Sequence, residues 1–343
     1  MDFEDKKIWQ QACGDTDRNY SKTCIKWSVI LNGPGYGGSY PECLKHIGSS
    51  RKRTDLSRFS SQIKEGDIIV LRLGTKKVFG VGEVVGEYEW SESFSDVDGW
   101  DLQHVRRVRW FWHDLEKPKR FSTYDLKQGD TTQILKKGSV RDWVLSLKKQ
   151  YETVDYQLPK IPEHGCIIGQ EEISEHLFEQ GISSNSIETL SREFDEIRRI
   201  AKWYRGKDAP SEFETVAYLV VPLLRALGWT PQRMAIEWCK VDLALFDQLP
   251  REDQNLAVVV EAKKKDNSCL TAQSQAQRYA DGKHKCLRLI VTDGLRYGVY
   301  VKDEETYILK AYFNLTELRE AYPIYDCGGV KQALTMMTPE WRY

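Results

Sequence analysis

The chain has 343 residues, of which 41% are hydrophobic and 29% charged, and its formal net charge is −1 at pH 7. This composition is typical of a globular protein with room for two domains, and the charge excludes a uniformly basic nucleic-acid-binding protein. No apolar run approaches the ~20 residues that cross a bilayer, and the N-terminus is too acidic and polar for a signal peptide. We therefore expect a cytoplasmic protein without a membrane partner.

The first 150 residues are rich in tryptophan, glycine and short alternating runs, a pattern typical of β-strands. The expected strands cover residues 26–33, 66–74, 78–90 and 105–112. Together they predict a compact β-rich domain over residues 1–150. A basic stretch at residues 49–64 is compatible with phosphate binding and equally with a solvated loop.

Residues 151–190 contain prolines and glycines without a sustained period, so we expect a linker there, with one short helix. The second domain is expected over residues 191–343. A helix follows Pro210, with Ser211 and Glu214 at the spacing of a capping box. Further elements are expected as strands at 240–247 and 255–265, a helix at 269–283, and strands at 286–294 and 296–303. This order predicts an α/β sheet.

Charged residues end the apolar strand "LAVVVEAKKKD" in the second domain. Glu261 and Lys263 are two residues apart and share a face of the strand, and Asp242 begins the preceding strand. If the strands pair, the two carboxylates reach one edge of the sheet, where they suit Mg²⁺ or Mn²⁺ with water in the remaining positions. Lys263 would then orient an attacking water and offset the phosphate charge. Each residue taken alone is also typical of a solvated strand end.

Glu214 is a third carboxylate able to reach the same ion, directly or through water. An acid in the first turn of a helix is also favourable through capping and the helix dipole alone. The sequence leaves both interpretations open.

Five segments of the second domain, in their order, resemble the nuclease domain of type I restriction enzyme R subunits, within the PD-(D/E)xK nuclease superfamily. The segments are "SEFETVAYLVVPLLRALGW", "VDLALF", "VVVEAKK", "QAQRYA" and "LIVTDGLRYGVYV". The resemblance covers about residues 205–305. It implies that Asp242, Glu261 and Lys263 bind a divalent metal and hydrolyse phosphodiesters, and that Glu214 is the family's helix glutamate.

The resemblance also covers a Q-x-x-x-Y motif, formed here by Gln275 and Tyr279 at positions i and i+4 of one helix face. It implies that these two residues contact the nucleic acid or arrange the active site. An ordinary amphipathic helix with a half-buried tyrosine shows the same pattern.

Aromatic and basic residues of the first domain are candidates for nucleic-acid binding. Aromatic rings in a cleft can sandwich a base flipped out of a duplex, whereas many tryptophans simply fill a small β-rich core. The candidate base-binding residues are Trp27, Tyr36, Trp90 and Trp100. The candidate phosphate-binding residues are Arg51, Lys52, Arg53 and Arg106.

Most of residues 20–145 resembles, more loosely, the PUA-like domains that include the EVE and YTH domains. The segments that carry this resemblance are "KWSVILNG", "IKEGDIIVLRLGTKKVFGVGEV" and "VRRVRWF". It implies an N-terminal PUA-like barrel that reads modified bases in DNA or RNA through an aromatic pocket, joined to a C-terminal restriction-endonuclease-like domain.

A base reader joined to a nuclease predicts a modification-dependent DNA restriction endonuclease that defends a prokaryotic cell against phage. The chain contains no G-x-x-x-x-G-K-[ST] motif, so we expect no nucleotide cofactor. Because one active site cuts one strand, a double-strand break predicts a homodimer or two successive nicks. Two alternatives stay open: a nuclease directed to RNA, and a catalytically silent nucleic-acid-binding protein.

Overall fold

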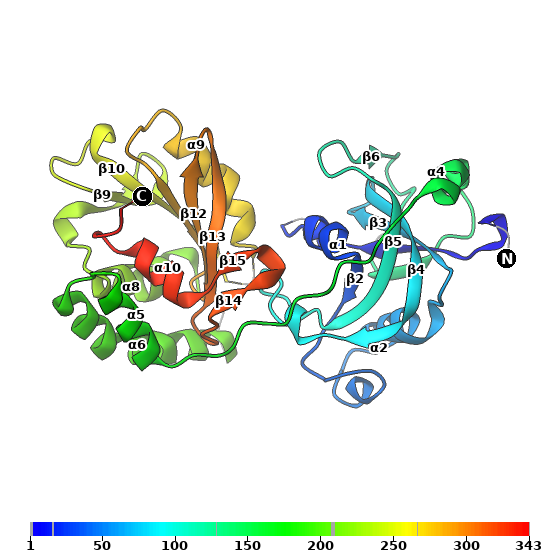
Figure 1. Ribbon diagram of the computed structural model, residues 1–343, viewed down its shortest axis with the longest axis horizontal. Helices are drawn as coiled ribbons and strands as arrows, with labels where there is room; N and C mark the ends of the chain where they lie inside the picture. Colours follow the sequence, from blue (N-terminus) through cyan, green and yellow to red (C-terminus); the bar gives the residue numbers. More distant parts are fainter. Residues whose placement is uncertain (1–2, 16, 128, 207–209, 266, 343) are drawn as a thin grey trace. The chain divides into compact units, whose positions relative to one another are not determined.

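The computed structural model describes residues 3–342 except 16, 128, 207–209 and 266. It divides the chain into two compact units, Met1–Glu163 and His164–Tyr343, and each unit contains its own sheet (Figure 1). The protein is therefore a mixed α/β protein with two sheets, which agrees with a two-domain arrangement. Among the described residues, no helix has the length and apolar character needed to cross a membrane.

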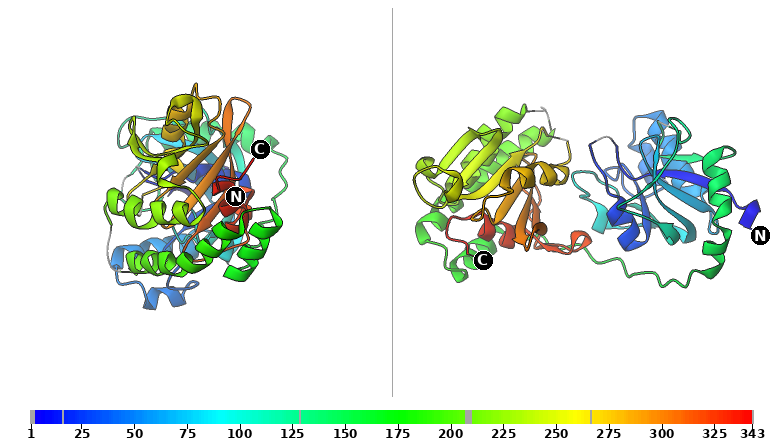
Figure 2. Two further views of the ribbon diagram at one scale, coloured as in Figure 1. Left: turned by 90° about the vertical axis from the view of Figure 1, so that its left-hand side faces the viewer. Right: turned by 90° about the horizontal axis from the view of Figure 1, so that it is seen from above.

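The division falls inside the segment expected to be a linker. Helix α4 (Lys148–Thr153) is the last helix of the first unit, and residues 154–163 follow it without a helix or strand (Figure 2). Helix α5 (Gln170–Glu179) then packs in the core of the second unit through Ile173 and Leu177, which are almost fully buried. The connection is consequently shorter than 151–190, because the apolar face of α5 belongs to the second core.

The sheet of the first unit runs in the order β2-β5-β4-β3-β1-β7, with β6 paired to β4. Its strands are β1 (Ile8–Ala12), β2 (Val29–Asn32), β3 (Ile68–Leu73), β4 (Lys77–Trp90), β5 (His104–His113), β6 (Lys119–Arg120) and β7 (Thr132–Ile134). Neighbouring strands are antiparallel except β1 and β3. The strands expected from the sequence correspond to β2, β3, β4 and β5, whereas β1, β6 and β7 were not expected.

Buried polar side chains connect the two end strands of this sheet. Gln11 Nε2 donates to Leu31 O at 2.8 Å, and Thr132 Oγ1 donates to Gln11 Oε1 at 2.7 Å. Asn32 Nδ2 lies 3.2 Å from Thr132 Oγ1 and 3.1 Å from Asp55 Oδ2. Because buried polar groups require partners, the network holds β2 near β7 and ties helix α2 (Ser50–Ser57) to both.

The helices of the first unit lie between and after the strands. They are α1 (Ser21–Trp27), α2, the π-helical turn η3 (Arg58–Gln62), α3 (Ser139–Ser146) and α4. The strand expected at residues 26–33 begins only at Val29. Ser28 takes a left-handed conformation (φ 55°) and its N–H caps the carbonyls of Cys24 and Ile25, which ends α1. Trp27 is therefore the last residue of a helix.

The sheet of the second unit runs in the order β14-β15-β13-β12-β11-β10-β9-β8. Its strands are β8 (Met234–Trp238), β9 (Val241–Phe246), β10 (Leu256–Ala262), β11 (Arg288–Thr292), β12 (Arg296–Asp303), β13 (Thr306–Asn314), β14 (Ala321–Tyr322) and β15 (Cys327–Gly328). Strands β10 and β11 are parallel, whereas β9 is antiparallel to β10 and β11 is antiparallel to β12. The expected α/β sheet is confirmed.

Helices cover both faces of this sheet. They are α5, α6 (Ser184–Gly206), α7 (Glu212–Thr215), the π-helical turn η5 (Val216–Val220), α8 (Val221–Ala226), α9 (Gln273–Ala280) and α10 (Val330–Met337). The larger core lies under α5, α6, α8 and α10, whereas α9 packs on the opposite face (Figure 1). The apolar residues of β10 are divided between these two cores, which accounts for its uniformly hydrophobic sequence.

Arg106, a candidate phosphate ligand, is a structural residue. It lies on β5 with 1% of its surface exposed. Its guanidinium donates to the carbonyls of Phe59 at 3.2 Å, Ser60 at 2.7 Å and Ile63 at 2.8 Å. These bonds fix the turn η3 after α2, so the phosphate-binding role expected for Arg106 is corrected: its donors are already used inside the domain.

We predict that Arg106→Met lowers the free energy of unfolding by about 2–4 kcal/mol, because three carbonyls lose the charged donor that Arg106 provides. Urea denaturation measures the change. The matched control is Arg53→Met, on exposed α2, which should change the free energy of unfolding by less than ~0.5 kcal/mol. Equal effects of the two substitutions would contradict this role of Arg106.

Candidate functional site

Two paired strands of the second unit bring a pair of acids to one end of the sheet. Strand β9 is antiparallel to β10, with Leu243 opposite Val260. Asp242, at the start of β9, consequently lies beside the end of β10, where Ala262 N donates to Asp242 Oδ2 at 2.7 Å. The strand pairing that the sequence suggested is present, and Asp242 and Glu261 lie at the same edge.

Glu261 and Lys263 project from the same face of β10, as expected. Lys263 Nζ donates to Glu261 Oε1 at 2.7 Å and to Gln275 Oε1 on α9 at 3.2 Å. The backbone continues the sheet here, since Lys263 N donates to Thr292 O at 2.7 Å. Glu261 is 1% exposed and the Lys263 side chain 24% exposed. The Lys263 ammonium group therefore lies between the buried Glu261 carboxylate and the solvent.

Glu212, the first residue of α7, is the acid that the sequence analysis missed. Burial raises the pKa of its carboxyl group, and the charge of Asp242 raises the pKa further, whereas the Lys263 ammonium and the Lys264 backbone amide lower it. Glu212 thus interacts electrostatically with the strand-end cluster. Residues two positions apart lie on nearly opposite sides of a helix, so only one glutamate of the E-F-E segment can face the sheet.

Glu214 takes part in the helix cap. Its Oε2 accepts hydrogen bonds from Ser211 N and from Ser211 Oγ, both at 2.8 Å, and Ser211 Oγ caps Glu214 N at 3.2 Å. These bonds with Ser211 lower the pKa of Glu214, which is fully exposed. Of the two interpretations that the sequence allowed, the structure shows the capping box, and it places Glu212 rather than Glu214 toward the strand-end cluster.

The cluster, defined as Glu212, Asp242, Glu261 and Lys263, has unusual electrostatics. Burial raises the pKa of Glu261 to about 7, the charges of Asp242 and Glu212 contribute in the same direction, and the hydrogen bond from Lys263 opposes them. Burial also raises the pKa of Asp242, against the Ala262 amide and Lys263. Several carboxyl groups with raised pKa values at one sheet edge are typical of functional sites.

The chemistry of the cluster fits a divalent cation with few protein ligands. Glu261 Oε2 is buried and has no hydrogen-bond partner within the described part of the chain, so it is an available oxygen ligand. No group of three or more His, Cys, Asp or Glu residues forms a metal-binding cluster among the described residues. Asp242 and Glu261 are the two carboxylates that would hold such a cation, with water in the remaining positions.

The two residues of the Q-x-x-x-Y motif have different positions. Gln275 accepts a hydrogen bond from Lys263, whereas Tyr279 is partly buried and packs against the core beneath α9. The structure therefore brings Gln275 to the cluster and gives Tyr279 a packing contact.

In the first unit, two of the candidate aromatic residues line one cavity of about 320 Å³. Tyr36 is 68% exposed, and its N–H donates to Asp101 Oδ2 at 2.8 Å. Trp100 is held by Tyr20, with ring centroids 6.1 Å apart, and by the Arg18 guanidinium 4.5 Å from its ring. We call this hollow the base cavity.

Trp27 and Trp90 are not among the described residues that line the base cavity. The Lys26 ammonium lies 4.5 Å from the ring of Trp27. The indole of Trp90 packs edge-on against His104 at 5.1 Å. Asn32 and Asp101 also line the base cavity and were not predicted from the sequence. Asn32 is the last residue of β2, directly before the glycine-rich stretch, and this position was the available signal.

The basic candidates on α2 differ in their surroundings. Lys52 lines the base cavity and also a neighbouring cavity of about 650 Å³, which Arg51 and Trp100 share. Arg51 Nε is paired with Asp130 Oδ1 at 2.7 Å. Arg53 is exposed and lines neither cavity. Lys52 and Arg51 are thus placed beside the base cavity, unlike the buried Arg106.

Comparison with known proteins concerns the first unit. The family model "Domain of unknown function (DUF8426)" matches residues 36–134. The match includes Tyr36, Trp100 and the whole of α2, and it ends at Ile134, the last residue of β7. A search of curated proteins found no match.

We predict a pH-dependent stabilisation by Glu261→Gln. The folded-state pKa of Glu261, about 7, exceeds the ordinary value of 4.5, so the stability that this group contributes is fully present below about pH 4.5 and is lost as the pH rises through 7. In EDTA at pH 8.5, the glutamine variant should exceed the wild type by about 1–3 kcal/mol in urea unfolding, and the difference should shrink at pH 5.

Two controls belong to that measurement. Glu214→Gln should instead destabilise the protein at pH 8.5, because the hydrogen bonds with Ser211 lower the pKa of Glu214. Added Mg²⁺ should stabilise the wild type at pH 8.5 and leave Glu261→Gln unchanged. A glutamine variant that is no more stable than the wild type at pH 8.5 would argue against a strained, buried carboxylate.

Proposed function

We propose that the protein is a modification-dependent DNA endonuclease that hydrolyses phosphodiesters with Mg²⁺ or Mn²⁺ and without a nucleotide cofactor. The observation that carries the proposal is the buried Glu261 carboxylate, which receives a direct hydrogen bond from Lys263 and has one oxygen without a partner among the described residues. A solvated strand end would not bury its acid in this way, so the arrangement favours a reactive site over a surface charge cluster.

The surroundings of the cluster support a PD-(D/E)xK nuclease domain in the second unit. An acid at the start of β9, the E-x-K segment at the end of β10, a helix before them and α9 after them follow the order expected of that fold. Glu212 on α7 supplies the helix acid. The resemblance implied that Glu214 is the helix acid, and the proposal assigns this role to Glu212 instead.

Each residue of the cluster would have a separate role in the reaction. Asp242 and Glu261 would hold the cation, which supplies Lewis acidity and an activated water when bound. Lys263 positions the water and offsets the negative charge that develops on the phosphate. Gln275 holds the Lys263 ammonium from α9. Glu212, with its raised pKa, stands at the rim as a proton acceptor.

The first unit, in this proposal, is a PUA-like barrel whose base cavity accepts a modified base flipped from the duplex. A volume of about 320 Å³ suits a single base, and Tyr36 and Trp100 offer ring faces for stacking. Asn32 is held by Asp55 and Thr132, so the cavity wall is formed before binding. Lys52 and Arg51 are placed for the flanking phosphates.

We expect the purified protein with Mg²⁺ to cut DNA that carries methylated, hydroxymethylated or glucosylated bases and to spare unmodified DNA. Glu261→Ala and Lys263→Ala should each reduce cleavage on the order of 10²-fold or more. Trp100→Ala should abolish the preference for modified DNA. Unreduced cleavage by both active-site variants would contradict the nuclease, and preferential cutting of RNA offered with DNA of the same sequence would redirect the proposal to RNA.

A comparison of the two helix glutamates tests the assignment of the third acid. Glu212→Gln should reduce cleavage on the order of tenfold or more, because it removes a proton acceptor from the cluster. Glu214→Gln should retain near wild-type cleavage, since that residue caps the helix at the surface. Gel-based initial rates at saturating Mg²⁺ distinguish them. The opposite ranking would restore Glu214 as the functional acid.

A further inference from the structure

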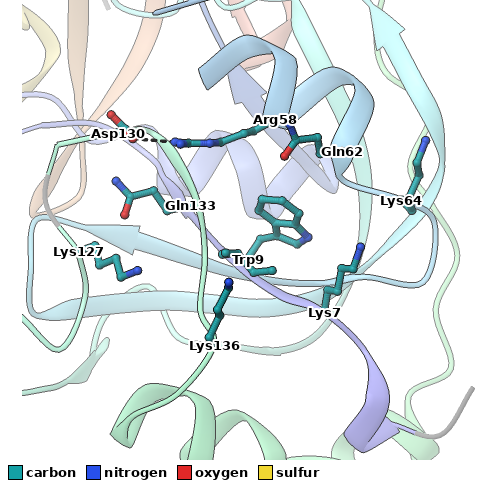
Figure 3. A pocket seen from close by; sticks show the side chains of 10 residues that line it. Lys7, Trp9, Arg58, Gln62, Lys64, Lys127, Asp130, Gln133 and Lys136 are labelled. Carbon is teal, nitrogen blue, oxygen red and sulfur yellow. Dashed lines mark hydrogen bonds and ion pairs between the residues drawn. The ribbon is translucent and has the colours of Figure 1, made fainter. Parts of the chain in front are cut away.

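A third cavity of the first unit is lined by basic side chains. It has a volume of about 650 Å³ and lies beside β1 and β7, with Trp9 at its centre (Figure 3). Its basic residues are Lys7, Arg58, Lys64, Lys127 and Lys136. We call it the lysine cavity. Its basic residues come from separate chain segments that only the folded sheet brings together.

The lysine cavity carries uncompensated positive charge. Asp130 is the acid among its described lining residues, and both of its oxygens are taken, by Arg51 Nε and by Arg58 Nη1, each at 2.7 Å. The ammonium groups of the four lysines have no ion pair or hydrogen bond to any described residue, and all four side chains are exposed. Positively charged groups around one cavity repel one another, and a bound anion reduces this repulsion.

The floor of the lysine cavity is rigid and does not offer a stacking face. Trp9 is 4% exposed, and its Nε1 donates to Asp67 Oδ2 at 2.8 Å. Gln62 and Gln133 add neutral amide groups to the wall (Figure 3). Cations and amide donors above a buried ring suit phosphate oxygens, which position a nucleic acid, better than a base, which requires an exposed ring or an edge contact.

The lysine cavity and the base cavity each share lining residues with the neighbouring cavity that Arg51, Lys52 and Trp100 line, which we call the middle hollow. Asp130 lines both the lysine cavity and this middle hollow. Lys52 and Trp100 in turn line both the middle hollow and the base cavity. A nucleic-acid strand that places one base beside Trp100 therefore has the basic residues Lys52, Arg51 and Arg58 along the way to the lysines.

We propose that the lysine cavity binds successive phosphates of the nucleic-acid strand whose modified base occupies the base cavity. The proposal rests on the base-reading role proposed for the first unit and is independent of the nuclease chemistry of the second. It makes the lysines a source of affinity and leaves the discrimination between modified and unmodified bases to Tyr36 and Trp100.

The test uses the full-length protein in EDTA, so that nothing is cleaved, and a fluorescent duplex with and without a modified base. One variant carries Lys7→Gln, Lys64→Gln and Lys136→Gln. The matched control removes three exposed lysines outside the lysine cavity, as Lys22→Gln, Lys117→Gln and Lys149→Gln. Both variants have the same net charge, so a difference between them reports position rather than total charge.

The dissociation constant is measured between 50 and 200 mM salt. In a plot of the logarithm of the association constant against the logarithm of the salt concentration, each lost phosphate contact reduces the magnitude of the slope by about 0.9. The slope of the cavity variant should therefore be smaller in magnitude by about 2 to 3. Its ratio of affinities for modified and unmodified DNA should stay unchanged. The control variant should keep the wild-type slope, and Trp100→Ala should lose the affinity ratio while keeping the slope.

Equal slopes for the two triple variants would overturn the proposal, and so would a wild type that binds no nucleic acid. A further competition experiment adds ATP at constant ionic strength. If ATP displaces the duplex from the wild type but not from the cavity variant, the lysine cavity binds a free nucleotide and the proposal is overturned. A lysine-dependent slope without cleavage in Mg²⁺ would refute the nuclease alone, whereas cleavage with equal slopes would refute this inference alone.

Discussion

The burial of the Glu261 carboxylate at the end of β10 is the constraint on which the proposed active site depends. The strand is buried along its whole length, so its last acid is held in a low-dielectric position that disfavours its charge. Lys263 compensates part of that cost from the same face of the strand, and Gln275 holds the lysine. The remaining oxygen has no partner among the described residues, and this unmet requirement is what a cation would satisfy.

In the first unit, a polar network has the corresponding role. Asp55 accepts from Thr132 N at 2.8 Å and from Asn32 Nδ2 at 3.1 Å, so α2 is joined to both end strands of the sheet. Arg106 fixes the turn after the same helix. The basic residues of α2 are consequently displayed from a rigid support between the base cavity and the lysine cavity. Positioning by buried hydrogen bonds is what allows surface lysines and arginines to bind with defined register.

Features that local rules decide were predicted from the sequence. The alternation of side chains along a strand placed Glu261 and Lys263 on one face, and the apolar runs located β9 and β10, whose pairing the structure then shows. Features for which several positions share one local pattern were not resolved. Glu212 and Glu214 both begin the same helix, and only the packing of α7 decides which of them faces the strands. Arginine is a residue type usually found on the surface, and Arg106 is buried because its guanidinium bonds the carbonyls of the turn η3 and of Ile63 after it.

By itself, the sequence determined the two-part organisation, the α/β order of the second unit and the acid and lysine at the end of β10, because these follow from periodicity and spacing within short segments. Only the tertiary structure decided which helix acid joins that cluster, which aromatic residues line the base cavity and where the lysine cavity lies. Those features are made by residues far apart in the chain, such as Lys7 and Lys136, and their proximity depends on the pairing of β1 with β7. The sequence of a short segment does not indicate which distant strand it pairs with.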